Sequence, residues 1–299
     1  MTPSATHDRR LAGIGLMLLG IFVFALNDAL GKWLVATYSV GQLLLIRSAA
    51  ALLILLPFLW REGSAPFKAA PRPWLQIARP VFSTFEVACF YWALTAMPLA
   101  DVMTFYLAGP IYVTAISPLL LGEHVGWRRW LAVVAGFIGV MIALNPSAHA
   151  LTAPALIAIA GSFSFSLLMI CTRLVRGTSD LVLITTQTGG ALVFGLIVAP
   201  FTWTPLDVRD SALLILLGVT AMVAHVCINR SLKLAPASVV VPYQYTTILW
   251  AILLGYFIFG DIPRVDMLIG AGVIIAAGIY IFIREARRRI ATGMVDPPA

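Results

Sequence analysis

Long apolar runs dominate the sequence, and the short segments between them hold most of the charged residues. A helix needs about 20 mostly apolar residues to cross the hydrocarbon core of a membrane. Ten runs reach roughly that length, and we expect a helix in each. The first five are Leu11–Leu30, Gly41–Leu59, Pro80–Met97, Val102–Leu121 and Trp127–Leu144. The second five are Ala153–Thr172, Leu181–Pro200, Ser211–Ile228, Pro236–Phe259 and Met267–Ile283. The predicted fold class is therefore an all-α integral membrane protein with ten transmembrane helices.

The composition supports a membrane protein and excludes three other classes. Hydrophobic residues make up 61% of the 299 residues and charged residues only 11%, whereas about a quarter of a soluble domain is charged. A fold in water needs more polar surface than this chain can supply. A soluble enzyme, a nucleic-acid-binding protein and a disordered chain are therefore excluded. The cysteines are isolated in apolar runs and predict neither a disulfide framework nor a metal site (Cys89, Cys171 and Cys227).

Lys and Arg residues are distributed unevenly between the two sides of the predicted membrane. With a cytoplasmic N-terminus, sixteen of the 20, Arg79 among them, lie in cytoplasmic segments, three lie on the other side and Arg47 lies inside a span. Because cytoplasmic loops are enriched in Lys and Arg, both termini are expected to be cytoplasmic. The net charge of +7 is then explained by contact with anionic lipid headgroups of the bilayer, without a nucleic-acid partner.

The two halves of the chain resemble each other. Offsets of 141 and 138 residues align "GIFVFALNDALGKWL" with "GSFSFSLLMICTRLV" and match charges, glycines and prolines: Gly20 with Gly161, Lys32 with Arg173, Pro98 with Pro236, and Glu123 with Asp261. Chance agreement between apolar strings is the alternative. Each half has five spans, an odd number, so the second half enters the membrane with inverted topology. Many carriers place their substrate site where such repeats meet, and the repeat therefore favours a transporter.

The chain resembles the EamA-type, ten-helix members of the drug/metabolite transporter superfamily over nearly its whole length. The resemblance rests on the 5+5 repeat, on "LADVMTFYLAGPIYVTAISPLLLGEHVGWRRWLAVVAGFIGVMIALNP" and on its weaker copy "FIFGDIPRVDML". The segment "NDALGKWLVATYSVGQLLLIRS" is similar to a bacterial branch with riboflavin and S-adenosylmethionine importers. The resemblance to the EamA-type transporters implies a first five-helix repeat over residues 11–146 and a second over 151–284, with cytoplasmic tails 1–10 and 285–299.

The resemblance implies a secondary transporter in the bacterial inner membrane that moves a small organic metabolite by alternating access. Riboflavin, or a similar aromatic vitamin or nucleoside-like solute, is the expected imported substrate. The alternative is an exporter of amino-acid-like or cationic drug-like metabolites, with or without proton coupling. The sequence contains no His-Glu-x-x-His, Gly-x-Ser-x-Gly or Walker motif and no acidic metal cluster, so neither an enzyme nor a cofactor is expected.

Charged side chains inside the predicted spans are the first candidate site residues, because a charge in the hydrocarbon core is costly. Glu86 is near the membrane centre, with Phe82 and Phe90 on the same helical face. It is expected to bind substrate or a proton, or else to be a protonated carboxyl that bonds a neighbouring helix. Arg47 needs a partner, which Asp28 or Glu86 would provide, either for binding or as a structural ion pair.

Polar and aromatic side chains of other spans complete the candidate set. In the second half, His225 and Asn229 are four residues apart, and Gln187 and Gln244 lie at comparable depth. His225 is either a coupling residue or a hydrogen-bonded packing residue. Three tyrosines lie too deep for an interfacial belt and are expected to line a cavity that stacks flat or cationic solutes (Tyr106, Tyr112 and Tyr243).

Small residues and prolines predict how the helices pack and bend. Asn27 shares a helix face with Gly13 and Gly20, and this face is expected to pack closely against another helix. Pro110 and Pro242 lie inside spans and predict bends. The fifth and tenth spans carry small-residue pairs that predict either helix packing or a homodimer interface: Ala132 with Gly136, and Gly272 with Ala276.

Overall fold

The structure, a computed structural model, describes residues 3–120, 127–144, 152–175, 177–234 and 241–291. Every regular element within these residues is helical. The first half contains α1 (Pro3–Val35), α2 (Val40–Glu62), α3 (Ala65–Lys68), α4 (Pro73–Leu94), α5 (Leu99–Tyr106), α6 (Gly109–Leu120) and α7 (Trp127–Leu144). The second contains α8 (Ala153–Leu174), α9 (Asp180–Val198), η1 (Ala199–Thr202), α10 (Val208–Leu234), η2 (Val241–Thr246), α12 (Thr247–Phe259) and α13 (Val265–Ala291).

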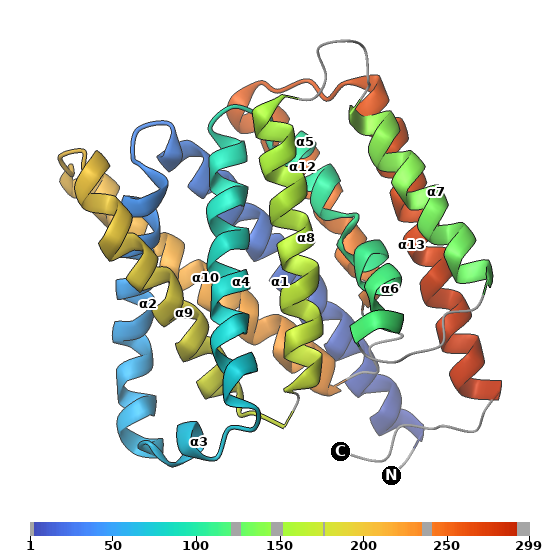
Figure 1. Cartoon of the computed structure of the whole chain (residues 1–299), viewed down its shortest axis with the longest axis horizontal. Helices are drawn as coiled ribbons and strands as arrows, with labels where there is room; N and C mark the ends of the chain where they lie inside the picture. The colour runs from blue at the N-terminus through green and yellow to red at the C-terminus, as the bar shows by residue number, and fades with distance from the viewer. Residues whose placement is uncertain (1–2, 121–126, 145–151, 176, 235–240, 292–299) are drawn as a thin grey trace.

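The helices run side by side along one bundle (Figure 1). Helix α1 begins and α13 ends at the same end of the bundle, which we call the terminal end; the opposite one is the far end. Five described helices have the length and apolar composition to cross a membrane: Leu11–Val35, Val40–Glu62, Ala153–Thr172, Asp180–Thr202 and Val208–Ile228. Shorter apolar helices accompany them, and the fourth and ninth predicted spans are each divided into two elements.

Both breaks lie at the predicted prolines. Helix α5 ends at Tyr106 and α6 begins at Gly109, because Pro110 has no N–H to donate to the carbonyl four residues earlier. In the ninth span, Pro242 lies in the 3₁₀-helical η2, which continues into α12 at Thr247. The regular α-helix is therefore interrupted near both prolines, and a bend at each of them stays a prediction.

The start of the third span was predicted wrongly. Helix α4 begins at Pro73, where a proline without an N–H is tolerated in the first turn, and Pro80 lies inside the helix. As a consequence Arg79 does not lie in the loop before this helix. It lies within α4 and only 3% of its surface is exposed.

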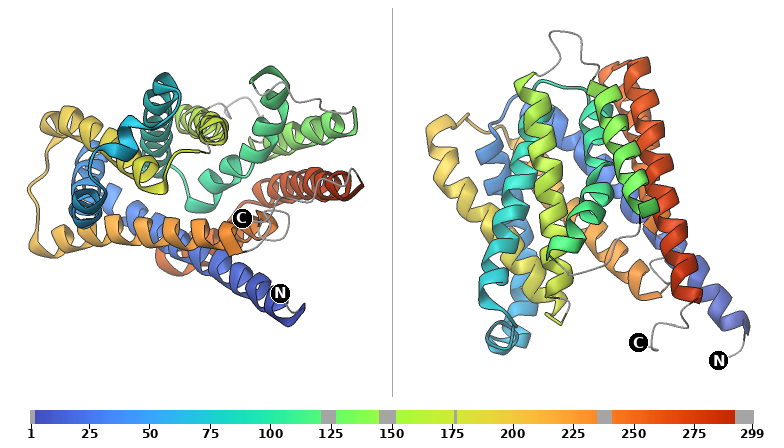
Figure 2. Two further views of the ribbon diagram at one scale, coloured as in Figure 1. Left: turned by 90° about the horizontal axis from the view of Figure 1, so that it is seen from below. Right: turned by 45° about the vertical axis from the view of Figure 1, so that its right-hand side comes forward.

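Each repeat packs mainly against the other. Helix α1 packs against α10, α2 against α9, α4 against α8 and α9, and α7 against α13; the last pair lies at one side of the bundle (Figure 2). The predicted packing face of α1 is confirmed. Asn27 donates hydrogen bonds to the Leu217 carbonyl (2.6 Å) and the Thr220 hydroxyl (2.8 Å) of α10. Gly20 lies against α10 so closely that a Cβ would be 2.8 Å from Ile228.

The small-residue pairs of the fifth and tenth spans have different surroundings. Ala132 is 5% exposed, and a Cβ at Gly136 would overlap the side chain of Ile111. For this pair the structure agrees with the first of the two predicted alternatives, helix packing within the chain. A Cβ at Gly272 would meet no atom of another element within 4 Å, and Ala276 is exposed. A homodimer through this face alone stays a prediction.

Candidate functional site

Three charged side chains from three helices of the first repeat converge inside the bundle. Glu86 of α4 interacts electrostatically with Arg47 of α2 and with Asp28 of α1, and Asp28 also interacts with Arg47. At 1.5 Å of rise per residue, each lies about 10–12 Å along its helix from the far end. All three are half-buried. Because they converge, they cannot all face lipid, so they form a polar centre between the helices.

Arg47 is oriented by a tyrosine and not by a carboxylate. Its guanidinium Nη1 donates a hydrogen bond to the Tyr91 hydroxyl (2.9 Å) and its Cζ lies 5.6 Å from the centroid of that ring. Within the described residues, Arg47 forms no ion pair with Asp28 or Glu86, so the predicted pairing is wrong. Tyr91 is 1% exposed and packs against Gly31, where a Cβ would overlap the tyrosine ring. Close contact between α1 and α4 therefore fixes the hydroxyl that holds Arg47.

Tyr91 was not among the residues predicted from the sequence. It follows Glu86 by five positions in the same span, and a tyrosine inside a span needs a partner for its hydroxyl. The sequence therefore indicates that the Tyr91 hydroxyl has a hydrogen-bond partner. It could not indicate Arg47, because one sequence does not show that α2 and α4 approach each other at this depth.

Aromatic rings lie beside the charged centre. The Phe90 ring packs edge-on against Tyr91 (5.4 Å between centroids) and Tyr106 (5.2 Å). The Tyr106 hydroxyl donates a hydrogen bond to the Glu86 carbonyl oxygen (3.0 Å). Phe90 and Tyr106 thus lie next to Glu86 and offer ring surfaces adjacent to charged groups.

Three other predicted aromatics lie elsewhere. Phe82 packs in a cluster of α4 and α8 around Leu75 and Cys171. Tyr112 is 5% exposed and lies between rings of α7 and α8, so it is a packing residue. Tyr243 packs against the Met17–Ile21 cluster of α1. None of these contacts joins them to the charged centre.

Two described polar residues of the second repeat interact with a second buried arginine, Arg79. His225 of α10 contacts Phe24 edge-on (4.9 Å) and interacts electrostatically with Arg47 and Arg79. Gln187 of α9 accepts a hydrogen bond from Arg79 Nη1 (3.3 Å). Gln244 is half-buried in η2, and the side chain of Asn229 lies outside the described residues. His225 therefore lies within electrostatic range of both arginines.

Arg79 anchors α4 to α9. Its guanidinium donates to the Leu183 carbonyl, to the Thr186 hydroxyl (3.2 Å) and to Gln187, and its Nε has no partner. All three acceptors are neutral. Sequence reasoning missed this residue because it took Pro80 for the start of the helix; Pro73 directly after Arg72 was the signal for an earlier start.

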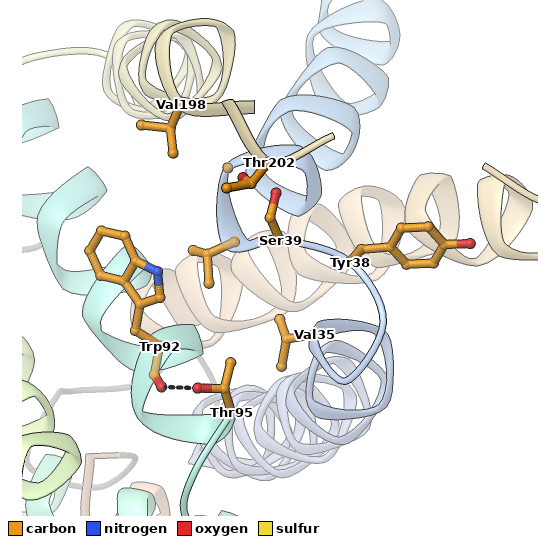
Figure 3. A pocket seen from close by; sticks show the side chains of 9 residues that line it. Val35, Tyr38, Ser39, Trp92, Thr95, Val198 and Thr202 are labelled. Atoms are coloured by element: carbon orange, nitrogen blue, oxygen red, sulfur yellow. Dashed lines mark hydrogen bonds between the residues drawn. The ribbon is translucent and has the colours of Figure 1, made fainter. Parts of the chain in front are cut away.

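A pocket of about 340 Å³ opens at the far end, separate from the predicted residues (Figure 3). Trp92 of α4 lies about 9 Å along the helix from Glu86, and Tyr38 is directed toward Asp210, to which its hydroxyl donates (2.7 Å). The pocket is lined by Val35, Tyr38, Ser39, Val40, Gly41, Trp92, Thr95, Val198 and Thr202. The described part of the chain contains no group of His, Cys, Asp and Glu residues that could hold a metal ion.

Residues 11–145 and 152–284 each match the EamA-like transporter family. The chain belongs to this family. Its fold is therefore two five-helix repeats of a membrane protein, as the sequence predicted, and its class is transporter and not enzyme.

Several named transporters are similar to almost the whole chain. An S-adenosylmethionine uptake transporter of Rickettsia felis is 26% identical over 93% of this chain and 94% of its own length. A riboflavin transporter of Rhizobium johnstonii is 28% identical over 94% of both chains. The pseudopaline exporter CntI of Pseudomonas aeruginosa is 23% identical over 91% of this chain and 96% of its own. A crystal structure of a protein with 17% identity matches the fold over 91% of this chain and 94% of its own, with a TM-score of 0.59.

Proposed function

We propose that this chain imports a nucleoside-like metabolite by alternating access, and that S-adenosylmethionine is the substrate whose chemistry fits best. The observation that carries the proposal is the convergence of Arg47 with Asp28 and Glu86 beside the rings of Phe90 and Tyr106. S-adenosylmethionine has a carboxylate, two cationic groups and a flat purine. Arg47 binds the carboxylate, the two acids bind the cations, and the rings stack against the purine. Relatives with that substrate support the assignment.

Riboflavin is the second candidate. Its flat ring system is neutral, so it uses the aromatic surfaces and hydrogen bonds to Gln187 or Gln244 but leaves the charges of the centre without a role. The aromatic cluster around Phe90 and the riboflavin transporter among the relatives favour it. Export of an amino-acid-like or cationic metabolite, with Glu86 as the counter-charge, is the alternative direction, and the exporter among the relatives supports it.

We infer that the terminal end faces the cytoplasm and that the protein lies in the bacterial inner membrane. The excess of Lys and Arg in the segments at this end supports the orientation, and the burial of Arg79 removes only one residue from it. In this orientation the charged centre lies nearer to the outer surface. In this proposal Glu86 carries the proton whose movement is coupled to that of the substrate, which makes proton coupling a testable part of the proposal.

The experiment is uptake of labelled S-adenosylmethionine and riboflavin into bacterial cells that import neither. Wild type, Arg47→Gln and Glu86→Gln are compared, each with and without a protonophore. Glu62→Gln is the matched control, because Glu62 is exposed at the end of α2. We expect the wild type and the control to accumulate S-adenosylmethionine, and both centre variants to lose at least about tenfold in initial rate, or 1.4 kcal/mol.

The other outcomes are informative. Accumulation of riboflavin alone selects the second candidate. Loss of preloaded substrate with no uptake makes the protein an exporter. Full activity in both centre variants removes the charged centre from the transport site, and uptake that resists the protonophore indicates a facilitator.

A further inference from the structure

An ion pair joins the two repeats at the far end of the bundle. The Lys32 ammonium, near the end of α1, pairs with Asp261, which follows α12. Their side chains are only 12% and 23% exposed. The same ammonium lies 4.4 Å from the centroid of the Phe259 ring, so α12 and the turn after it hold the lysine from two sides.

The backbone fixes the position of Asp261. Gly260 has a φ of +69°, a left-handed conformation that glycine adopts without strain, and it ends α12. The amide of Asp261 then turns back and donates to the Gly255 carbonyl (3.1 Å). The carboxylate is therefore held at the end of a rigid helix rather than on a free loop.

The broken helices α5–α6 and η2–α12 have different packing partners at the two ends of the bundle. Near the far end, α5 of the first repeat packs against α12 of the second. Toward the terminal end, the other halves of the same broken helices have separate partners, since α6 packs against α7 and α8 while η2 packs against α1. The Lys32–Asp261 pair thus lies where the two repeats meet through their broken helices.

A second acid is available to Lys32 within its own repeat. Asp101 lies in the first turn of α5 and is 6% exposed, and its Oδ1 is buried without a hydrogen-bond partner. It interacts electrostatically with Lys32 and Asp261, with Arg264 before α13, and with Asp266 in the first turn of α13. A buried carboxylate oxygen without a donor is unfavourable, and a lysine that leaves Asp261 would satisfy it.

We propose that Lys32 and Asp261 are the gating residues of the far end: their ion pair holds the pathway closed there, and the pathway opens when Lys32 moves from Asp261 to Asp101. The inference rests on the proposed alternating access. In the closed state the lysine bridges the repeats; in the open state it is bound within the first repeat, so α1 and α5 separate from α12. The sequence repeat agrees, since each half carries a cation at the end of its first span and an acid after its fourth (Lys32 and Asp261, Arg173 and Glu123).

Hydrogen–deuterium exchange of the purified full chain tests the gate without any substrate. We expect Lys32→Ala and Asp261→Asn to raise exchange in peptides that cover α5 and α12 about tenfold, and to leave α9 unchanged. Asp101→Asn removes the partner of the open state and should lower exchange in the same peptides. The double variant Lys32→Asp with Asp261→Lys restores an attractive pair and should return to the wild-type pattern.

The control is Arg61→Ala, which removes an exposed cation at the end of α2, at the opposite end of the bundle. It should exchange like the wild type. Unchanged exchange in both single neutral variants overturns the proposal, as does a folded double variant that exchanges as fast as they do. If a single variant fails to fold, the double variant decides alone. If the wild type transports neither labelled compound but the exchange pattern is as expected, the substrate proposal fails and the gate stands.

Discussion

The hydrogen bond between Arg47 and Tyr91 is the contact of the charged centre whose strength can be worked out and measured. Tyr91→Phe removes the hydroxyl and keeps the ring that packs against Gly31 and Phe90. Hydrogen bonds between membrane helices average about 0.6 kcal/mol and reach about 1.7, whereas those to charged groups contribute about 1.5–3 kcal/mol. Because the donor is charged but half-buried, we expect Tyr91→Phe to lower the free energy of unfolding by about 1–2 kcal/mol.

A double-mutant cycle isolates this contact from other effects of the substitution. Arg47→Met keeps an unbranched chain but cannot donate, so Tyr91→Phe should change stability little in that background. The free energies of unfolding come from reversible denaturation in mixed micelles with increasing sodium dodecyl sulfate. Tyr256→Phe is the control, because Tyr256 is 55% exposed on α12.

Independent sites add to within about 0.3–0.5 kcal/mol. A coupling energy below about 0.5 kcal/mol would therefore refute the assignment of Tyr91 as the residue that holds Arg47. A large coupling energy with unchanged uptake would confirm the contact and show that it has no role in transport.

Other contacts give predictions of different kinds. Gly218→Ala places a Cβ against the α2 backbone, which cannot move aside, and should destabilise the protein by about 1–3 kcal/mol in the same denaturation assay, whereas Gly272→Ala has open space and should not. Asn27→Ala loses two hydrogen bonds to α10 and should lower stability by about 1–2 kcal/mol. The Asp210 carboxylate accepts the hydrogen bond of Tyr38 and so raises the pKa of that phenol. This stabilisation is full below about pH 10, the ordinary value, and is lost as pH rises through the raised pKa. Thermal melts from pH 9 to 11 should therefore show a steeper loss in the wild type than in Tyr38→Phe.

Span number and helix breaks could be predicted because each depends on local chemistry. Twenty apolar residues have few alternatives to a transmembrane helix, and a proline cannot donate wherever it is placed, so the breaks beside Pro110 and at Pro242 follow from the sequence. The start of α4 failed because two prolines compete for the first turn. Pro73 and Pro80 both satisfy the rule, and only packing of the extra turns against α9, through Arg79, decides between them.

The composition of the charged centre could be predicted, but its pairing could not. Asp28, Arg47 and Glu86 stand out in the sequence because each is a charge inside a span. Which of them touch depends on the rotation of α1, α2 and α4 about their own axes. That rotation is set by close contacts between residues far apart in the sequence, such as the contact of Gly218 with the α2 backbone. The rotation of α4 also directs Phe82 into a packing cluster and leaves Phe90 at the centre.

The partner of Arg47 has a consequence for how a carrier can bind a charged solute. A guanidinium locked to Glu86 in a low-dielectric interior would have to leave a strong ion pair before it met a substrate carboxylate, and separating buried charges costs several kcal/mol. The Tyr91 hydroxyl orients Arg47 instead and occupies one N–H group of the guanidinium. Because the hydroxyl oxygen is neutral, the positive charge of Arg47 has no carboxylate in direct contact. Asp28 and Glu86 remain near enough to lower the energy of the cation but do not bond to it. On the proposed function, a solute that carries both signs of charge completes both halves of this centre at once, which is why a zwitterionic nucleoside fits it better than a neutral flavin.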